Sequence, residues 1–234
     1  MFDKAHERIS ALHAGARPFF TLVFSSSNHT PFEFPDGRIE LFDTQKQTVH
    51  NAVKYADHAL GQFIAQACSS AYWADTLFLV VADHDTRVYG DELVPVSKFH
   101  IPGVILGSDL PARRIDSLVS QIDLAPTLLS LMGIDGEHPF AGRDLTRTLP
   151  EFGNSPAPVH ARAMMQFDQN FAWLERNLLT VLLPDGSSRQ FAFDRRTQSL
   201  APATTTDHEA VRQALANVLM PAWLYREQRY RTAN

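Results

Sequence analysis

Residues 77–85 read Leu-Phe-Leu-Val-Val-Ala-Asp-His-Asp, an apolar run that ends in a histidine between two carboxylates. A near-continuous apolar run of this length predicts a strand buried on both faces. A second run, Phe-Phe-Thr-Leu-Val-Phe at 19–24, also ends in polar residues, Ser-Ser-Ser-Asn-His-Thr-Pro at 25–31. Between them, residues 43–68 carry apolar side chains at helical spacing. This order predicts an α/β protein with a mostly parallel sheet flanked by helices.

The remaining segments up to residue 150 continue the α/β pattern. A short helix is expected at 3–14, and a third apolar run lies at 101–106. The helix at 43–68 has Asp43 or Thr44 as a cap. A further helix is expected at 123–132. It has an N-cap, a proline in its first turn and a glycine stop, which are Asp123, Pro126 and Gly133.

The composition changes after Pro150, where a proline-containing connector covers 154–158. Three segments then predict a small antiparallel meander with one recognisable turn, and a terminal helix is predicted after it. The segments are 161–167, 171–182 and 189–193, the turn is Pro184-Asp185-Gly186, and the helix is 207–219. We therefore expect residues 1–150 to form an α/β core. Residues 151–234 are expected to form an antiparallel β subdomain with a terminal helix, packed on the same domain.

Composition excludes several classes of protein. The chain has 234 residues and a mass of 26.2 kDa, with 44% hydrophobic and 20% charged residues, which is ordinary globular usage. A compact domain of this mass exposes roughly 10,000–11,000 Å². The net charge of −5 argues against a nucleic-acid partner. Cys68 is the single cysteine, which excludes an internal disulfide framework. The apolar runs are far shorter than the ~20 residues that span a bilayer.

The candidate chemistry lies where the two buried strands end. In an open α/β sheet, ligands bind outside the carboxyl ends of the strands, so His29 and the pair Asp83 and His84 would share one edge. Carboxylate oxygen and imidazole nitrogen both bind Zn²⁺ or Mn²⁺, although Asp-His after a strand can also be a loop cap. His29 could donate a hydrogen bond to an anionic substrate oxygen, or be a solvated turn residue.

His100 is a third candidate because of the short connection before it. Residues 86–99 show no helical period, and a parallel crossover needs a dozen or more residues and usually a helix. The strand at 101–106 would therefore run antiparallel and bring His100 back near Asp83. The alternative is a structural histidine that enters a strand. Lys98 and Arg87 could neutralise an anion at the same rim, or be solvated surface residues.

Five motifs in order resemble the sulfatase branch of the alkaline phosphatase superfamily, and most closely the lipoteichoic-acid-synthase-like phosphoglycerol transferases. The resemblance covers about residues 18–145. The motifs are Ser27-Asn28-His29-Thr30-Pro31-Phe32, Tyr55-x-Asp57-x-x-Leu60-x-x-Phe63, Ala82-Asp83-His84, Phe99-His100-Ile101-Pro102 and Asp123-Leu124-Ala125-Pro126-Thr127-Leu128-Leu129-x-Leu131-x-Gly133-Ile134.

The resemblance implies an alkaline-phosphatase-like fold and a metal-bound, covalent phospho- or sulfo-enzyme mechanism. Asp83 and His84 match a pair of metal ligands, and His29 matches a histidine that binds the substrate head group. The cofactor implied is a divalent metal (Mn, Mg, Zn or Ca), incompletely coordinated in this chain. The family's nucleophile and a further acidic ligand lie upstream of the matched part, so we expect a C-terminal portion without a nucleophile. Asp85 stands where the family usually has glycine.

Two hypotheses follow from the resemblance. In the first, the parent protein is a metal-dependent phosphoglycerol or phosphoethanolamine transferase, or a sulfatase, with His29 and His100 on substrate oxygens. Its substrate would be a phosphate or sulfate ester such as a lipid head group or glycan. It would act in the cell envelope, attached to the membrane through a segment outside this chain. In the second, a degenerate domain binds an anionic glycan, a lipid head group or a protein partner without catalysis.

Overall fold

The computed structural model describes residues 1–85, 90–153 and 161–231. The chain divides into two compact units that alternate along the sequence. The first unit is Met1–Val81 with Gly103–Leu110, and the second is Ala82–Pro102 with Pro111–Asn234. The division at residue 150 into a core and a subdomain remains a prediction.

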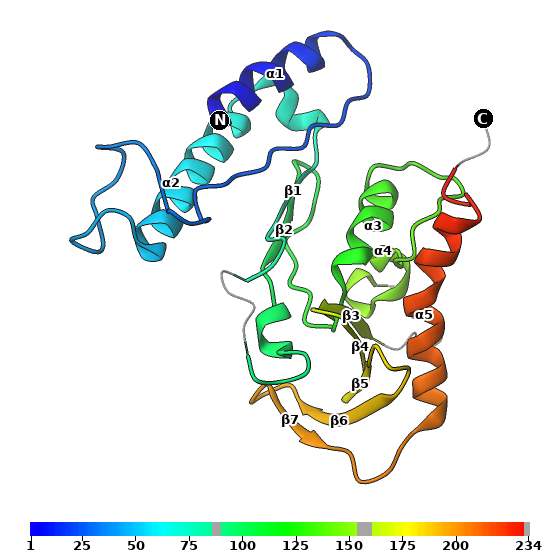
Figure 1. Cartoon of the computed structure of the whole chain (residues 1–234). Helices are drawn as coiled ribbons and strands as arrows, with labels where there is room; N and C mark the ends of the chain where they lie inside the picture. The colour runs from blue at the N-terminus through cyan, green and yellow to red at the C-terminus, as the bar shows by residue number, and fades with distance from the viewer. Residues whose placement is uncertain (86–89, 154–160, 232–234) are drawn as a thin grey trace. The chain divides into compact units, whose positions relative to one another are not determined.

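The first unit is built from two helices and a two-stranded sheet (Figure 1). Its elements are α1 (Phe2–Ala14), α2 (Val49–Cys68), the 3₁₀ helix η1 (Ala71–Asp75), β1 (Phe78–Val81) and β2 (Gly103–Leu106). Apolar side chains from α1, α2, η1 and β1 form one core cluster, whose buried members are Ala5, Ile9, Phe63, Ala67, Tyr72 and Phe78. The helix predicted at 3–14 is confirmed, and the helix predicted at 43–68 is confirmed over Val49–Cys68. Both helices contribute to the core cluster that contains Phe78 of β1.

The strands β1 and β2 pair antiparallel, with Phe78 opposite Leu106 and Val81 opposite Gly103. The backbone N–H of Ala82 then donates to the carbonyl of Pro102 at 3.3 Å, so the two chains stay adjacent one step beyond the ladder. This confirms the predicted antiparallel return at 101–106. The physical reason is the short connection between the two strands. Its sequence shows no helical period, whereas a parallel crossover usually needs a helix.

The strand predicted at residues 19–24 is wrong. This segment is extended but belongs to no sheet, and all strand pairs of the described residues are antiparallel. Phe19 and Val23 pack against the core cluster of the first unit. The alternate side chains Phe20, Leu22 and Phe24 are 84%, 77% and 70% exposed. The segment therefore has the alternation of a strand without a neighbouring strand to pair with.

The helix α2 begins at Val49, six residues later than the pattern predicts. Its N-cap is Thr48, whose Oγ1 accepts from the backbone N–H of Asn51 at 3.3 Å, rather than Asp43 or Thr44. Residues 43–48 form a loop instead, held by the side chain of Asn51. The side chain of Asn51 bonds the backbone of this loop, and the loop takes the place of the first helical turns that the pattern predicts.

The second unit contains a five-stranded antiparallel sheet, with its strands in sequence order. The strands are β3 (Arg162–Phe167), β4 (Asn170–Glu175), β5 (Leu178–Leu182), β6 (Ser188–Asp194) and β7 (Ser199–Pro202). The meander and the turn at 184–186 are confirmed, and Gly186 has a left-handed φ of +83°. The segment predicted at 171–182 is two strands, because a tight turn at Arg176 (φ +55°) splits it.

The helix α5 (His208–Arg226) packs against this sheet, beside which it runs in Figure 1. Shorter elements precede the sheet: η2 (Val96–Phe99), η3 (Gln121–Asp123), α3 (Leu124–Leu131), α4 (Leu145–Thr148) and η4 (Pro150–Phe152). The core cluster joins residues of the 82–102 segment to the sheet, and its buried members include Val94, Leu174, Leu179, Val181 and Phe193. None of the described helices is long and apolar enough to cross a membrane.

Candidate functional site

Asp83 and His84 lie on the loop that follows β1, with side chains 62% and 61% exposed. One carboxylate oxygen of Asp83, Oδ1, accepts from the backbone N–H of His84 at 3.0 Å, which is the contact of a loop cap. The other oxygen, Oδ2, lies 3.6 Å from Nε2 of His84. The two side chains therefore converge, while one oxygen also fixes the loop.

The tautomer of His84 follows from its second ring contact. Nδ1 lies 2.6 Å from the backbone carbonyl of Asp85. A carbonyl oxygen only accepts, so Nδ1 carries the hydrogen and a neutral ring has its lone pair on Nε2. In that form the Nε2 lone pair faces a carboxylate oxygen. Two acceptors that face each other repel unless a proton or a cation lies between them.

This donor pair fits one edge of a divalent metal site. Two ligands held about 2.1 Å from one tetrahedral cation lie about 3.4 Å apart, close to the separation found here. A metal-ligating histidine usually donates its other ring N–H to a carbonyl or carboxylate, as His84 does to Asp85. Among residues 1–85, 90–153 and 161–231, however, no three His, Cys, Asp or Glu side chains gather to complete such a site.

Asp85 and Lys98 lie close to this pair along the same segment of the second unit. The ammonium Nζ of Lys98 is 3.4 Å from Oδ2 of Asp85, and both side chains are partly exposed. The extra carboxylate at the position where the resemblance expects glycine thus has a cationic neighbour. Arg87, the other predicted rim cation, lies outside the described residues.

His100 follows η2, in the segment that returns to β2. Its Nδ1 lies 3.0 Å from the side-chain nitrogen of Gln198, in the turn between β6 and β7. Gln198 has a left-handed φ of +55°. Because an amide nitrogen only donates, Nδ1 of His100 accepts and its Nε2 carries the hydrogen of the neutral ring. His100 can therefore donate from Nε2.

His29 lies in a turn of the first unit. The backbone N–H of His29 donates to Ser26, its carbonyl accepts from Phe32, and the Thr30-Pro31 peptide is cis. The exposed ring places Nδ1 3.0 Å from the carbonyl of Thr30. Asp83, His84 and His100 belong to the other unit. Convergence of His29 with these three residues therefore remains a prediction.

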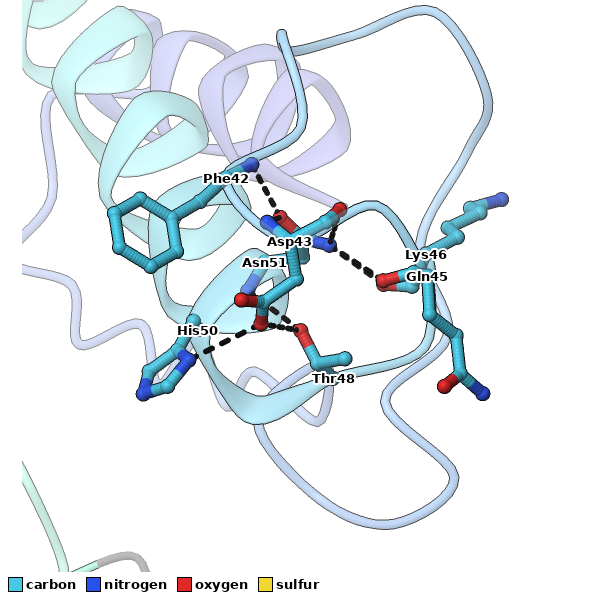
Figure 2. A network of polar contacts seen from close by, with 7 residues as sticks. All are labelled: Phe42, Asp43, Gln45, Lys46, Thr48, His50 and Asn51. Carbon is cyan, nitrogen blue, oxygen red and sulfur yellow. Dashed lines mark hydrogen bonds and ion pairs between the residues drawn. The ribbon is translucent and has the colours of Figure 1, made fainter.

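A buried amide that the sequence pattern did not reveal shapes the loop before α2 (Figure 2). Asn51 has no exposed surface. Its Oδ1 accepts from the backbone N–H groups of Phe42 and Asp43, at 2.6 and 3.1 Å. Its Nδ2 donates to three carbonyls, those of Asp43, Gln45 and Lys46, at 2.9 to 3.2 Å. The sequence pattern places Asn51 inside a helix and does not indicate that its side chain holds the preceding loop.

The Asp43 carboxylate adds a second layer to this loop. Its Oδ2 accepts from the hydroxyl of Thr48 and lies 3.1 Å from Nδ1 of His50 (Figure 2). The Thr48 hydroxyl and, to a lesser degree, His50 hold the pKa of the Asp43 carboxyl below its usual value. Asp43 thus helps to order the loop, while Thr48 is the cap of α2.

A second buried polar cluster centres on Asp123, which is 1% exposed. Asp123 stands at the N-cap of α3, as predicted, but its side chain makes no cap hydrogen bond to that helix. It completes a capping box with Ser120 and binds Arg162 through two bonds of 2.7 Å. Its Oδ1 also accepts from the backbone N–H of Arg143 at 2.7 Å. Burial lowers the pKa of the Arg143 guanidinium, and the charge of Arg162 lowers it further.

This cluster has a structural role in the second unit. Arg162 is the first residue of β3, and its guanidinium lies 5.5 Å from the ring centre of Trp173 on β4. Gly142 fits the same place because a Cβ there would meet the carbonyl oxygen of Ile122 at 1.8 Å. The Asp123–Arg162 pair therefore joins η3 to the sheet, and its oxygens already have donors.

The fold agrees with the comparisons to known proteins. Residues 1–134 match the sulfatase family model. The chain belongs to the sulfatase family. Lipoteichoic acid synthase-like YvgJ of Bacillus subtilis (strain 168) is 27% identical over 148 residues, covering 51% of this chain and 23% of YvgJ. The lipoteichoic acid synthase of Staphylococcus saprophyticus is 24% identical over 137 residues, 51% of this chain and 21% of that protein. The chain thus spans less than a quarter of these relatives.

Solved structures support the same assignment. A protein of the alkaline phosphatase superfamily from Vibrio parahaemolyticus matches 99% of this chain with a TM-score of 0.90 and 44% identity, over 55% of its own length. The structure of Ps i-CgsB, at 16% identity and a TM-score of 0.59, covers 92% of this chain and 52% of its own, and shows the fold alone. The resemblance to the sulfatase branch and the superfamily fold are therefore confirmed.

Proposed function

We propose that this chain supplies part of the active site of an enzyme that cleaves or transfers phosphate or sulfate esters, and that Asp83 and His84 bind its divalent metal. The relatives named lipoteichoic acid synthase favour phosphoglycerol or phosphoethanolamine transfer. The other reaction of the family is sulfate ester hydrolysis by a sulfatase. The observation that carries the proposal is the ring of His84. Its Nδ1–H is held by a carbonyl, and its Nε2 faces the Asp83 carboxylate.

The protein residues would divide the work between charge and orientation. The metal, when bound, would lower the pKa of a nucleophile and stabilise charge on the transferring group. Asp83 would supply a carboxylate oxygen and His84 its Nε2. His100 would donate from Nε2 to a substrate oxygen. His29, with Nδ1–H on the carbonyl of Thr30, can donate from Nε2 only as the doubly protonated ring.

We further propose that the nucleophile and the remaining metal ligands belong to a part of the catalytic domain that this chain does not contain. Two facts support this: the described residues include no third ligand beside Asp83 and His84, and the match covers 55% of the Vibrio chain. The substrate would be a lipid head group or glycan ester. The cell envelope would be the place of action, as the names of the lipoteichoic acid synthases suggest.

Paramagnetic broadening by Mn²⁺ tests the metal assignment at single residues. The chain contains a matched internal control, the exposed pair Asp57 and His58 on α2. Adjacent residues on a helix point in different directions, so this pair cannot converge on one ion. We expect Mn²⁺ to broaden the amide signals of residues 83 and 84 at lower concentration than those of 57 and 58. Asp83→Asn should abolish the difference, and Asp57→Asn should leave it intact.

Activity of the purified chain tests the missing nucleophile. With Mn²⁺ or Zn²⁺ present, we expect hydrolysis of p-nitrophenyl phosphate and p-nitrophenyl sulfate at the buffer rate. Turnover that disappears in Asp83→Ala would contradict the proposal that the nucleophile lies elsewhere. Equal broadening at 57–58 and 83–84 would contradict the metal site itself.

A non-catalytic binding domain is the second candidate. The observation that favours it is Asp85, a carboxylate at the family's glycine position, with Lys98 at 3.4 Å. In this case the chain would bind an anionic glycan, a lipid head group or a protein partner. Supplying the rest of a sulfatase catalytic domain would then restore no ester hydrolysis.

A further inference from the structure

The extended segment at residues 19–25 presents an apolar side to solvent. Phe20, Leu22 and Phe24 are the exposed members of its alternation, between 70% and 84% exposed. Single exposed apolar residues are common on protein surfaces, but three large ones on one side of one segment form a patch. Such patches on soluble proteins mark interaction sites.

The backbone of the same segment is unpaired. Among the described residues, none from 17 to 25 takes part in a backbone–backbone hydrogen bond, and the segment belongs to neither sheet. Figure 1 draws it as coil between α1 and the loop that precedes α2. Extended backbone with free N–H and C=O groups is a template for strand addition, in which main-chain bonds supply affinity.

The opposite side of the segment fixes it in place. Phe19 and Val23 pack against the core cluster that contains Phe78 of β1. The hydroxyl of Thr21, between them, is buried and has no hydrogen-bond partner among the described residues. The segment is therefore anchored and extended in advance, which lowers the entropy lost when a second strand pairs with it.

We propose that residues 19–25 are a docking strand for a complementary polypeptide, and that this polypeptide corresponds to the part of the Vibrio parahaemolyticus chain without a counterpart here. The match aligns nearly all of this chain with only 55% of that one, at a TM-score of 0.90. The complementary strand pairs with residues 19–25 and covers the side chains of Phe20, Leu22 and Phe24. This docking strand does not depend on the metal assignment.

The test co-expresses the full chain with the unmatched part of the Vibrio protein. Size-exclusion chromatography with light scattering should give a one-to-one complex. Amide hydrogen exchange at residues 19–25 should slow by about tenfold or more, because paired backbone is protected. Leu22→Asp places a charge on the exposed side, where it leaves the core untouched, and should abolish the complex. The matched control is Leu219→Asp on α5, a residue 54% exposed, which should bind as the unchanged chain does.

Three results would overturn the proposal. They are the absence of a complex, a complex in which amides 19–25 exchange as fast as before, and a homodimer of this chain that protects 19–25. Circular dichroism of Leu22→Asp should match that of the unchanged chain. Asp83→Asn should form the complex normally, so loss of the metal site and loss of docking are separate results.

Discussion

Single buried polar residues determine much of the local structure in both units. Asn51 satisfies two backbone N–H groups and three carbonyls of one loop, and Asp123 accepts from a guanidinium and two backbone N–H groups. A buried polar group costs free energy unless all its partners are present. These two residues are therefore the positions where a small chemical change has a large and directional effect.

Breaking the Asp123–Arg162 pair should destabilise the second unit strongly. The side chains are 2% and 3% exposed, so Arg162→Met leaves a buried carboxylate with only its backbone donors. We expect the free energy of unfolding to fall by about 3–5 kcal/mol, measured by urea denaturation. The control Arg226→Met removes an exposed pair with Glu227 and should change it by less than about 0.5 kcal/mol. Equal losses in both variants would contradict a special role for Arg162.

Asn51 offers a test that separates its two functions. Asn51→Ala removes both, and should cost about 2–3 kcal/mol while amide exchange at Phe42 and Asp43 accelerates. Asn51→Asp keeps the acceptor for those two N–H groups but turns a second oxygen toward three carbonyls. We expect it to be at least as destabilising as the alanine variant. A well-folded Asn51→Asp would show that the donors of Asn51 are unimportant.

Between elements, the contact of Ser117 with Glu151 on η4 is expected to depend on pH. Glu151 on η4 accepts from the hydroxyl and the backbone N–H of Ser117 through Oε1, at 2.7 and 3.0 Å. The Ser117 hydroxyl lowers the pKa of the Glu151 carboxyl below its ordinary value of 4.5. A carboxyl with a lowered pKa in the folded state stabilises above its unfolded pKa, and loses that contribution as the pH falls through the folded value.

Glu151→Gln should therefore differ most from the unchanged chain near neutral pH. The difference in free energy of unfolding should be constant above about pH 5.5 and shrink progressively below about pH 4.5. Urea midpoints at a series of pH values measure it. Ser117→Ala should reduce the same acid dependence, whereas Glu137→Gln, at an exposed glutamate, should reproduce the unchanged profile. A gap between Glu151→Gln and the unchanged chain that widens on acidification would refute the assignment.

The elements that the sequence predicted well are those whose periodicity reflects burial within the chain itself. The strand at 77–81, the helix at 123–132 and the C-terminal meander are examples. Residues 19–24 have the same apolar pattern, yet they form no strand. Hydrophobicity indicates that a surface is to be covered, but it does not identify the polypeptide that covers it. The helix α5 continues through Pro221 to Arg226, beyond the predicted end at 219.

Side-chain anchors were beyond prediction for a different reason. Asp123 and Asn51 both have local roles that a pattern can suggest, a cap and a helical position. Their actual partners, Arg162 and the carbonyls of 43–46, depend on tertiary contact or on where a helix begins. Of the candidate site, the sequence predicted that Asp83 and His84 follow a strand. It could not reveal the carbonyl that orients the His84 ring.

In the molecule as a whole, the proposed metal site and the proposed docking strand both lack partners among the described residues. Among the residues that the structure describes, the proposed metal site has two donors, and the extended segment of the first unit has no paired strand. A family model matches residues 1–134, while the curated relatives extend to more than four times the matched length. Both shortages would be removed together if one polypeptide supplied a strand to 19–25 and ligands to Asp83 and His84.

This link predicts that metal affinity rises on docking. Two exposed donors bind Mn²⁺ weakly, whereas a complete shell of deprotonated ligands binds far more tightly. We expect the complex with the unmatched Vibrio portion to bind Mn²⁺ about 100-fold or more tighter than the chain alone, measured by isothermal titration calorimetry. Asp83→Asn and His84→Gln should each lose most of that gain, and His50→Gln, in the loop network of Asp43, should keep it. A complex that forms and protects residues 19–25 without any gain in affinity would leave the docking strand in place and refute Asp83 and His84 as ligands, because the missing donors would have arrived and found no partial site to complete.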